Sequence, residues 1–315
     1  MTAFYRYRIY GLVVESALRL SSVEEVPRDG GEASIRMLAA PPGYFETRRP
    51  NTPPDPLDWI HHAVLDDGSV YMKAEGVFET VIAPDGRYAM CASLGGVDAR
   101  SLEANLVNFV LSASLTLQGE EPLHSTVVEI DGRAVGLLGL SGAGKSTLAA
   151  FLISRGADLV TDDMLRVTFE DGRVFAHPGP YRLKLFDDPG RRFLPGAVAD
   201  GHFNPLSGKL MMQPRPVPAP RSAPVPLAGL IHLGSPGDVP AGGMVSLARL
   251  GGLDLAKTVI SSTMDNRYSA PRRLERQLRF AARIADALPV YALHYPRSFD
   301  VMDEVAQLIR RTLPP

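Results

Sequence analysis

The sequence predicts an α/β protein with a β-rich N-terminal domain and a C-terminal domain built around a phosphate-binding loop. Three observations support this prediction. Residues 139–147 read Gly-Leu-Ser-Gly-Ala-Gly-Lys-Ser-Thr, and an apolar run before them and a helical pattern after them supply the expected strand and helix. Residues 4–97 are short apolar runs separated by turn signals, which is typical of β-hairpins. A helical period over 101–118 separates the two regions.

Size and composition allow two domains and exclude several classes of protein. The chain has 315 residues, of which 45% are apolar and 22% charged, an ordinary globular composition. Its formal net charge of −2 offers no electrostatic basis for binding nucleic acid or an anionic membrane. Cys91 is the only cysteine, so an intrachain disulfide is excluded. There is neither a signal-peptide pattern nor a run of about 18 apolar residues, and we therefore expect a soluble, cytoplasmic protein.

The N-terminal region is expected to consist of strands and one exposed loop. One strand is expected over 4–14. Two hairpins are expected where Asp-Gly pairs separate the apolar runs 59–65 from 70–73 and 80–82 from 88–91. The prolines of 41–56 predict an irregular surface loop. No cluster of residues here suggests chemistry, and we assign 1–100 to the β-rich domain.

A connecting helix and the C-terminal domain follow. We assign 101–122 to the connection, with Ser101 as the helix N-cap and Gly119 after its end. The C-terminal domain covers 123–315 and includes a long exposed excursion over 189–226. Its expected strands are 125–130, 134–140, 157–161, 165–169, 173–176, 182–186, 226–233, 244–250 and 289–295, and its expected helices are 146–155, 253–264, 271–288 and 299–313.

The loop predicts a nucleoside triphosphate site. Its glycines let backbone N–H groups turn toward an anion, and the helix that follows adds partial positive charge at its N-terminus. Lys145 is expected to reach the terminal phosphates, and the Ser146 hydroxyl is expected to bind Mg²⁺. The nucleotide-binding residues expected from the motif are Gly139, Ser141, Gly142, Ala143, Gly144, Lys145, Ser146 and Thr147.

Two adjacent acids, Asp162 and Asp163, end the strand expected over 157–161. Acids at the carboxyl end of a parallel-type strand lie where open α/β sheets bind ligands. One acid can face the terminal phosphate as a base or a metal partner. A turn-forming pair that caps a loop is the alternative, and the motif alone does not distinguish the two. An Asn-Lys-x-Asp segment typical of GTPases and a second Leu-Ser-Gly-Gly-Gln-like signature typical of transporter ATPases are both absent from the sequence.

The order of these motifs resembles the kinase domain of the HPr serine kinase/phosphorylase family. The shared features are His124, a hairpin, the Gly-x-Ser-Gly-x-Gly-Lys-Ser loop, Arg155-Gly156 at a helix end, and Leu-Val-Thr-Asp-Asp over 159–163. The resemblance implies an HPr-kinase-like fold for the C-terminal domain, with ATP and Mg²⁺ as cofactors. It also implies that Asp162 is the catalytic acid/base, that Asp163 pairs with or orients His124, and that Lys145 and Ser146 hold phosphate and the metal.

The sequence also departs from that family. Thr147 stands where the family usually has Glu, and the family's Glu-x-Arg-Gly-x-Gly segment, which supplies a metal-binding Glu, has no counterpart. Residues 177–186 occupy roughly that region. The second Mg²⁺ ligand is therefore open between Asp163 and Asp187.

The layout of the whole chain is similar to that of HPr-kinase-related enzymes that tailor ribosomal peptides, notably lasso-peptide kinases. The matching segments are 5–12, 123–125 and 289–297. This resemblance implies phosphorylation of a serine hydroxyl, often at the C-terminus, of a precursor peptide. The alternatives are an HPr kinase and a protein that senses a nucleotide without transferring phosphate. Assembly into a homo-oligomer is also open. Basic candidates for holding a peptide carboxylate or phosphate are Arg182, Lys184, Lys209 and Arg267, although a surface position with no such role is the more common case for each. The run Arg272, Arg273, Arg276 and Arg279 is expected to form a solvated helix face, with contact between one of these arginines and substrate phosphate as the alternative.

Overall fold

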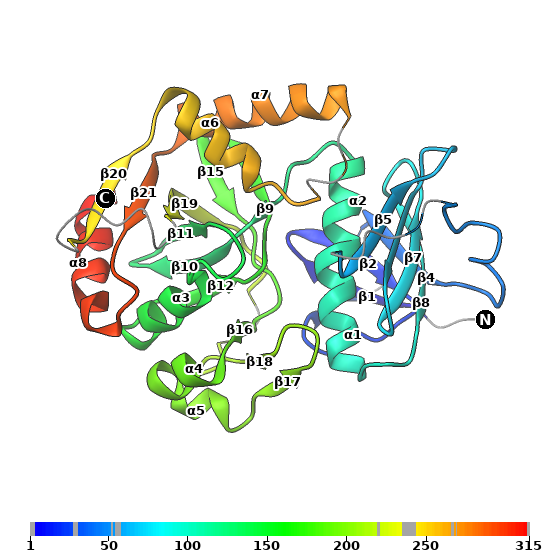
Figure 1. Cartoon of the computed structure of the whole chain (residues 1–315), viewed down its shortest axis with the longest axis horizontal. Helices are drawn as coiled ribbons and strands as arrows, with labels where there is room; N and C mark the ends of the chain where they lie inside the picture. The colour runs from blue at the N-terminus through cyan, green and yellow to red at the C-terminus, as the bar shows by residue number, and fades with distance from the viewer. Residues whose placement is uncertain are drawn as a thin grey trace. The chain divides into compact units, whose positions relative to one another are not determined.

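The chain divides into two compact units (Figure 1). The computed structural model describes residues 4–27, 31–51, 53, 58–218, 221–234, 244–265, 268 and 270–313. The first unit comprises Met1–Pro122 and Met264–Arg273, and the second comprises Leu123–Thr263 and Leu274–Pro315. Residues 264–273 therefore cluster with the first unit, although they lie within the range 123–315 that the sequence analysis assigned to the C-terminal domain. Within the described residues, no helix has the length and apolar character needed to span a membrane.

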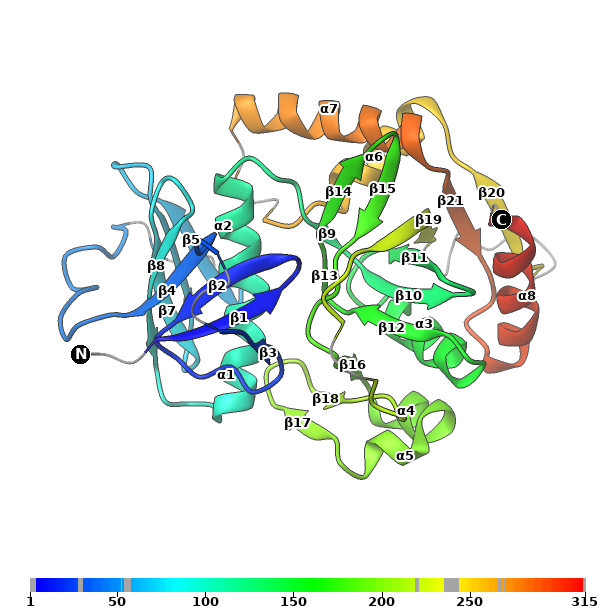
Figure 2. The same ribbon diagram turned by 180° about the vertical axis from the view of Figure 1, so that it is seen from behind.

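The described part of the first unit forms an eight-stranded sheet in the order β3-β1-β2-β4-β8-β7-β6-β5 (Figure 2). Antiparallel pairs link β5 to β6, β6 to β7 and β7 to β8, whereas β4 pairs in parallel with both β2 and β8. The strands are β1 (Tyr5–Ile9), β2 (Leu12–Ser16), β3 (Glu24–Glu25), β4 (Ile35–Ala39), β5 (Ile60–Val64), β6 (Val70–Ala74), β7 (Phe78–Ile82) and β8 (Tyr88–Ser93).

Both hairpins predicted at Asp-Gly pairs are present, as β5–β6 and β7–β8. The single strand expected over 4–14 is wrong. Tyr10 and Gly11 have φ values of 53° and 72° and fold this segment into the β1–β2 hairpin. The signal was missed because Tyr-Gly is not among the dipeptides that usually mark such a turn.

A long helical segment follows the sheet as α1 (Ala99–Asn105), the π-helical turn η1 (Leu106–Val110) and α2 (Leu111–Leu117). Its N-cap is Asp98 and not Ser101 as expected, because the Asp98 carboxylate accepts hydrogen bonds from the backbone N–H groups of Arg100 and Ser101. The end of α2 contacts the β7–β8 turn. There the Gln118 side chain donates to the Gly86 carbonyl, with a nitrogen–oxygen distance of 3.1 Å.

Arg273, at the start of α7 (Pro271–Ala287), corrects the expectation that the arginine run forms a solvated face. Its side chain is buried and pairs with the buried carboxylate of Glu121, with a nitrogen–oxygen distance of 3.1 Å. It also donates to the backbone carbonyls of Met264, Asp265 and Tyr268. Helical spacing alone did not reveal this role, because the partner carboxylate and carbonyls come from other segments.

The described part of the second unit is a mixed sheet with the strand path β12-β10-β11-β19-β15-β14, to which β21 and β20 add beside β19. The pairs β11–β19 and β19–β21 are parallel, and β10 is antiparallel to both β11 and β12. The strands are β10 (Thr126–Ile130), β11 (Arg133–Leu138), β12 (Asp158–Thr161), β14 (Val167–Glu170), β15 (Arg173–Ala176), β19 (Val225–Leu233), β20 (Ser246–Arg249) and β21 (Val290–His294).

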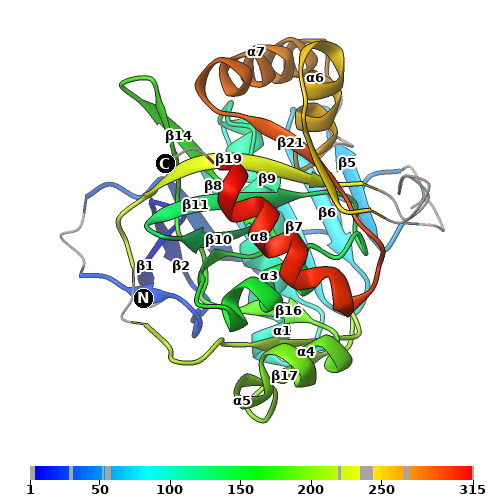
Figure 3. The same cartoon turned by 90° about the vertical axis from the view of Figure 1, so that its left-hand side faces the viewer.

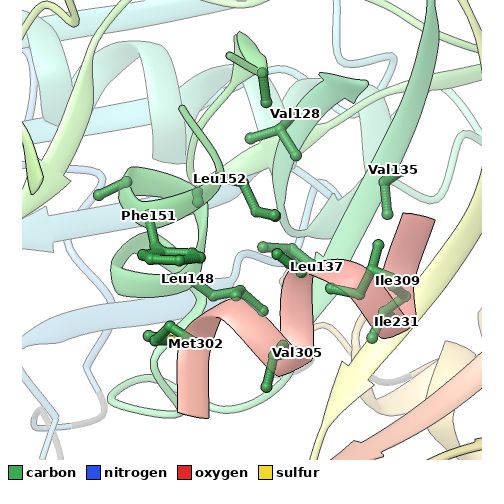
Figure 4. Packing of buried hydrophobic residues seen from close by; sticks show 14 of the residues in the cluster. Val128, Val135, Leu137, Leu148, Phe151, Leu152, Ile231, Met302, Val305 and Ile309 are labelled. Atoms are coloured by element: carbon green, nitrogen blue, oxygen red, sulfur yellow. The ribbon is translucent and has the colours of Figure 1, made fainter. Parts of the chain in front are cut away.

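Helices cover both faces of this sheet, so the mixed α/β class is confirmed (Figure 3). On one face, α3 (Lys145–Ser154) and α8 (Met302–Thr312) enclose a core that includes Leu137 and Ile231 (Figure 4). On the other, α6 (Gly252–Ser261) and α7 pack over a second core that includes Leu138 and Leu230. Neighbouring strand residues enter opposite cores, as a β-strand requires.

Residues 189–226 contain more structure than the exposed excursion expected from their Pro and Gly content. They include most of α4 (Asp187–Phe193) and all of α5 (Pro195–Val198), β17 (His202–Asn204) and β18 (Lys209–Met212). A three-stranded sheet forms in the order β16-β18-β17, where β16 is Leu183–Leu185. Residues 244–250, expected as a core strand, form β20 at a sheet edge with its side chains half-buried or exposed. Short elements β9 (Leu123–His124), β13 (Met164–Leu165) and η3 (Phe299–Val301) complete the described structure.

Candidate functional site

The predicted phosphate-binding loop connects β11 to α3 in the second unit. Gly139, Gly142 and Gly144 have φ values of 137°, 81° and 93°. Gly144 is the N-cap of α3, and a Cβ atom there would lie 3.2 Å from Nη1 of Arg297. The left-handed backbone favours glycine at this position, and a Cβ there would also press on the Arg297 guanidinium. The first helical turn, at Lys145, Ser146 and Thr147, directs backbone N–H groups away from the helix, which is the arrangement that can hold an anion.

Lys145 lies back over its own loop. Its Nζ donates to the carbonyl oxygens of Gly139 and Leu140, at 2.8 and 3.2 Å. The side chain is buried, and burial lowers the pKa of its ammonium to about 8 even though Asp162 and Asp163 oppose the shift. A phosphate beside this ammonium would favour its charged form, because it would supply the opposite charge that the loop carbonyls supply only in part.

The fold brings Asp162 and Asp163 to the same edge of the sheet as the phosphate-binding loop. The link is β10, which pairs with β11 on one side and with β12 on the other. Thr126 of β10 lies opposite Leu137, one residue before the end of β11, and its hydroxyl donates to Oδ1 of Asp162 at 2.6 Å. Since β11 and β12 each run antiparallel to β10, their carboxyl ends meet at one edge.

Lys184 of β16 contacts both acids. Its backbone N–H donates to Oδ2 of Asp162 at 2.8 Å, and its Nζ lies 2.6 Å from Oδ2 of Asp163. Lys184 was expected only as a candidate for holding peptide carboxylate or phosphate. In the structure its ammonium is paired within the acid cluster.

The surroundings move the pKa values of the two carboxyls apart. Burial raises the pKa of Asp162, and the neighbouring negative charge of Asp163 adds to the effect. Burial also acts to raise the pKa of Asp163, but the Lys184 ammonium outweighs it, with help from His124 and Arg182, and holds the pKa below its ordinary value. At neutral pH Asp163 is therefore firmly ionised, whereas Asp162 has the higher proton affinity of the pair.

His124 belongs to β9, which pairs with β13 immediately after the acid pair, so that His124 lies opposite Met164. Burial lowers the pKa of His124 to about 4, with a further contribution from the positive charge of Lys145. Asp163 acts on it electrostatically, and no hydrogen bond joins the two side chains among the residues that the structure describes. His124 is therefore near the acid pair but neutral at pH 7.

Other residues that the sequence analysis named as candidate ligands have different partners in the structure or lie outside the described residues. Asp187, the alternative metal ligand, begins α4 and pairs with Arg191 across one helical turn at 2.6 Å. The ammonium of Lys209 lies over the ring of Phe186. Arg182 contributes positive charge near Asp163. Arg267 lies outside the described residues.

Two residues of the site had no assigned role in the sequence analysis. Thr126 was one residue in a predicted strand, and no sequence signal shows which neighbour its hydroxyl meets. Arg297 follows β21; its guanidinium stacks on the ring of Tyr295, 4.8 Å from the centroid, and Nη2 donates to the Gly234 carbonyl at 2.6 Å. These contacts hold a cation beside Gly144 of the phosphate-binding loop.

The donor atoms fit a nucleotide-bound Mg²⁺ better than a metal held by protein alone. Among the described residues, no group of three or more His, Cys, Asp or Glu side chains could hold a metal ion. Mg²⁺ usually takes one or two protein oxygens together with phosphate oxygens and waters. The Ser146 hydroxyl at the start of α3 and the ionised carboxylate of Asp163 provide oxygens of that kind.

Comparisons with known proteins point to one family over a limited segment. No protein-family model matches the chain. The HPr kinase/phosphorylase of Lactobacillus johnsonii is 34% identical over 89 residues, which are 26% of this chain and 28% of that protein. The protein of the same name from Lactobacillus gasseri is 33% identical over 87 residues, 26% of this chain and 27% of that protein.

The match thus spans less than a third of the length of these curated relatives. Among solved structures, the Hpr(Ser) kinase/phosphatase from Coxiella burnetii is 15% identical to the chain and covers 61% of it, with 95% of that protein included and a TM-score of 0.33. The sequence similarity shows that a segment of the chain resembles HPr kinase/phosphorylases.

Proposed function

We propose that the chain is an ATP- and Mg²⁺-dependent serine kinase that transfers phosphate to a serine hydroxyl of a ribosomal peptide, such as the C-terminal serine of a lasso-peptide precursor. One observation carries the kinase part: the phosphate-binding loop after β11 and the acid pair after β12 lie at the same edge of one sheet, joined through Thr126. This arrangement supplies an anion site and a candidate base within one small region. The peptide substrate follows from the resemblance in layout described above.

In the proposed reaction, Asp162 accepts the proton of the serine hydroxyl while the serine oxygen bonds to the terminal phosphorus and the bond to the leaving ADP oxygen breaks. Thr126 and the Lys184 N–H occupy one lone pair on each Asp162 oxygen, so each oxygen retains another. The raised pKa of Asp162 suits this role, because a base works best when its pKa approaches the working pH.

Other residues would align the nucleotide and neutralise its charge. Lys145, the N–H groups at the start of α3 and the Arg297 guanidinium would surround the phosphates from the loop side. Ser146 and Asp163 would hold Mg²⁺, which supplies charge neutralisation at the phosphate oxygens. The opposite pKa shifts of the two acids support a division of roles between a base and a permanently ionised ligand.

The second candidate substrate is the protein HPr, which the 34% identical segment of an HPr kinase/phosphorylase favours. Labelled ATP should therefore be incubated with the full chain and, in parallel, with HPr or with a set of Ser-terminated peptides. Label on peptide supports the first proposal, and label on HPr supports the second. ATP binding without transfer to either would mean a nucleotide-sensing protein and would contradict both.

Two variants test the residue assignments. Asp162→Asn should retain ATP binding and lose transfer, whereas Lys145→Ala should weaken both. Asp158→Asn, an exposed acid at the start of the same strand β12, is the matched control and should behave as wild type. Normal turnover by Asp162→Asn would overturn its assignment as the base.

A further inference from the structure

The small sheet β16-β18-β17 presents a row of side chains toward the acid pair. Lys184 lies opposite Met211 in the β16–β18 ladder. Lys209 is two residues before Met211 on β18 and therefore projects from the same face as Lys184. Since the Lys184 ammonium contacts Asp163, this is the face that carries side chains to the proposed reaction centre.

Lys209 is held by an aromatic ring and not by an acid. Its Nζ lies 5.2 Å from the centroid of the Phe186 ring, which is a cation–π contact. Phe186 itself is 51% exposed, so its ring is accessible to a ligand. Among the described residues Lys209 has no ion-pair partner, whereas Lys184 is paired with Asp163 and Lys145 is bound by loop carbonyls.

The charge of Lys209 acts on the residues of the site. Burial is the main cause of the lowered pKa values of Lys145 and His124, and the positive charge of Lys209 contributes to both. The Lys209 ammonium is therefore within electrostatic range of His124 and of Lys145 in the phosphate-binding loop. Lys209 belongs to β18 of the small sheet. Arg297 approaches the loop from β21, which lies on the side of β11 away from β12.

We propose that Lys209 and the Phe186 ring form an acceptor anchor, in which the ammonium binds the C-terminal carboxylate of the peptide whose serine is phosphorylated and the ring packs against the peptide. The anchor rests on the proposed function, because it requires a peptide acceptor whose serine hydroxyl reaches Asp162. An ammonium without a protein counter-ion is complementary to a carboxylate. The exposed ring both holds the ammonium in place and offers apolar surface.

The test compares three peptides, each studied with the full chain. The first ends in Ser with a free carboxylate, the second is its C-terminal amide, and the third carries one Asp after the Ser and ends in an amide. For each peptide, kcat and KM for transfer are measured, together with direct binding of a fluorescein-labelled copy. The variants are Lys209→Met, Lys209→Arg and Phe186→Leu, and Lys257→Met on the exposed side of α6 is the matched control.

We expect Lys209→Met to raise KM for the free-carboxylate peptide about tenfold, the usual scale of one charge-assisted hydrogen bond, with KM for ATP changed less than about twofold. The amide peptide should bind wild type and Lys209→Met equally. Lys209→Arg should retain most of the affinity for the acid, and Phe186→Leu should lose part of it.

The anchor would be overturned if Lys209→Met weakened ATP and peptide equally, or the acid and amide peptides equally. A dependence on Lys209 confined to the Ser-Asp amide would also overturn it, because the bound group would then be a side-chain carboxylate. If wild type transferred phosphate to none of the peptides, the proposed function would fail. Carboxylate-dependent peptide binding that requires Lys209 would still support the anchor, and binding that ignores Lys209, or no binding, would contradict it.

Discussion

The hydroxyl of Thr126 donates to Oδ1 of Asp162 across 2.6 Å, and this hydrogen bond joins the strand beside the phosphate-binding loop to the strand that ends in the acid pair. It orients one buried carboxylate oxygen, while the Lys184 N–H orients the other. Two hydrogen bonds from two different strands therefore fix the plane of the Asp162 carboxylate. A base whose plane is fixed needs little reorganisation when it accepts a proton.

Thr126→Val should lower kcat without weakening ATP binding. The substitution keeps the β-branched shape of the side chain but removes the hydroxyl that holds Asp162. Loss of one hydrogen bond to a charged group corresponds to about a tenfold fall in kcat. Thr126→Ser, which keeps the hydroxyl, should retain most of the activity. The measurement is steady-state phosphoryl transfer combined with a titration of ATP binding, and an unchanged kcat in Thr126→Val would show that the hydrogen bond does not position the base.

Lys184→Met should destabilise the second unit. Lys184 and Asp163 are mostly buried, so removing the ammonium leaves a carboxylate without its partner. We expect the free energy of unfolding in urea to fall by about 2 kcal/mol, below the full cost for a completely buried pair because Asp163 retains some contact with solvent. The double variant Lys184→Met with Asp163→Asn should recover much of this loss. Equal stability of the single and double variants would mean that the ion pair is not what Lys184 contributes.

Gly144→Ala and Gly142→Ala form a matched pair of loop variants. Both glycines have positive φ, so an added Cβ strains both backbones by about 1 kcal/mol. Only at Gly144 would the new Cβ meet Arg297, since nothing lies within 4 Å of the corresponding atom at Gly142. We therefore expect the dissociation constant for ATP to rise more in Gly144→Ala than in Gly142→Ala.

Repeating this comparison in an Arg297→Ala background shows whether the contact is responsible. There the difference between the two glycine variants should shrink. If it kept its full size, the cause would lie in the loop backbone and not in the displaced guanidinium.

Local signals predicted the elements whose turns or periods are encoded by adjacent residues. The Asp-Gly pairs at 131–132 and 171–172 produce the β10–β11 and β14–β15 hairpins, because Asp and Gly adopt positive φ at little cost. The segment 189–226 was mispredicted because its short elements are stabilised by packing. Ala197 of α5 and Met212 of β18 belong to the same core as Leu148 of α3.

In the candidate site, too, the sequence predicted contiguous motifs but not the contacts between distant segments. The loop and the acid pair were visible as contiguous motifs, and the order of the strands then brings them to one edge of the sheet. The contacts of Asp162 come from Thr126 and Lys184, which are 36 and 22 residues away in the chain. Such partners depend on strand register, and no pattern within a single segment encodes that register.

The neutral, buried ring of His177 makes the free energy of unfolding depend on pH. Nε2 lies 3.0 Å from the Thr168 hydroxyl, and Nδ1 is buried without a hydrogen-bond partner among the described residues. Burial, assisted by the positive charge of Arg166, lowers the pKa of His177 to about 4. His177 in the unfolded chain therefore binds a proton near pH 6.5, whereas in the folded chain it binds one only near pH 4. The contribution of the neutral ring to the free energy of unfolding is complete above pH 6.5 and is lost as the pH falls from 6.5 to about 4.

We expect the free energy of unfolding to fall between these limits by up to about 1.4 kcal/mol per pH unit from His177 alone. His177→Gln, which cannot be protonated, should flatten this part of the profile relative to wild type. His61→Gln, on β5 of the first unit, is the matched control for the loss of one histidine. Urea unfolding at a series of pH values measures the effect, and parallel profiles for wild type and His177→Gln would show that His177 is protonated equally in the folded and unfolded states.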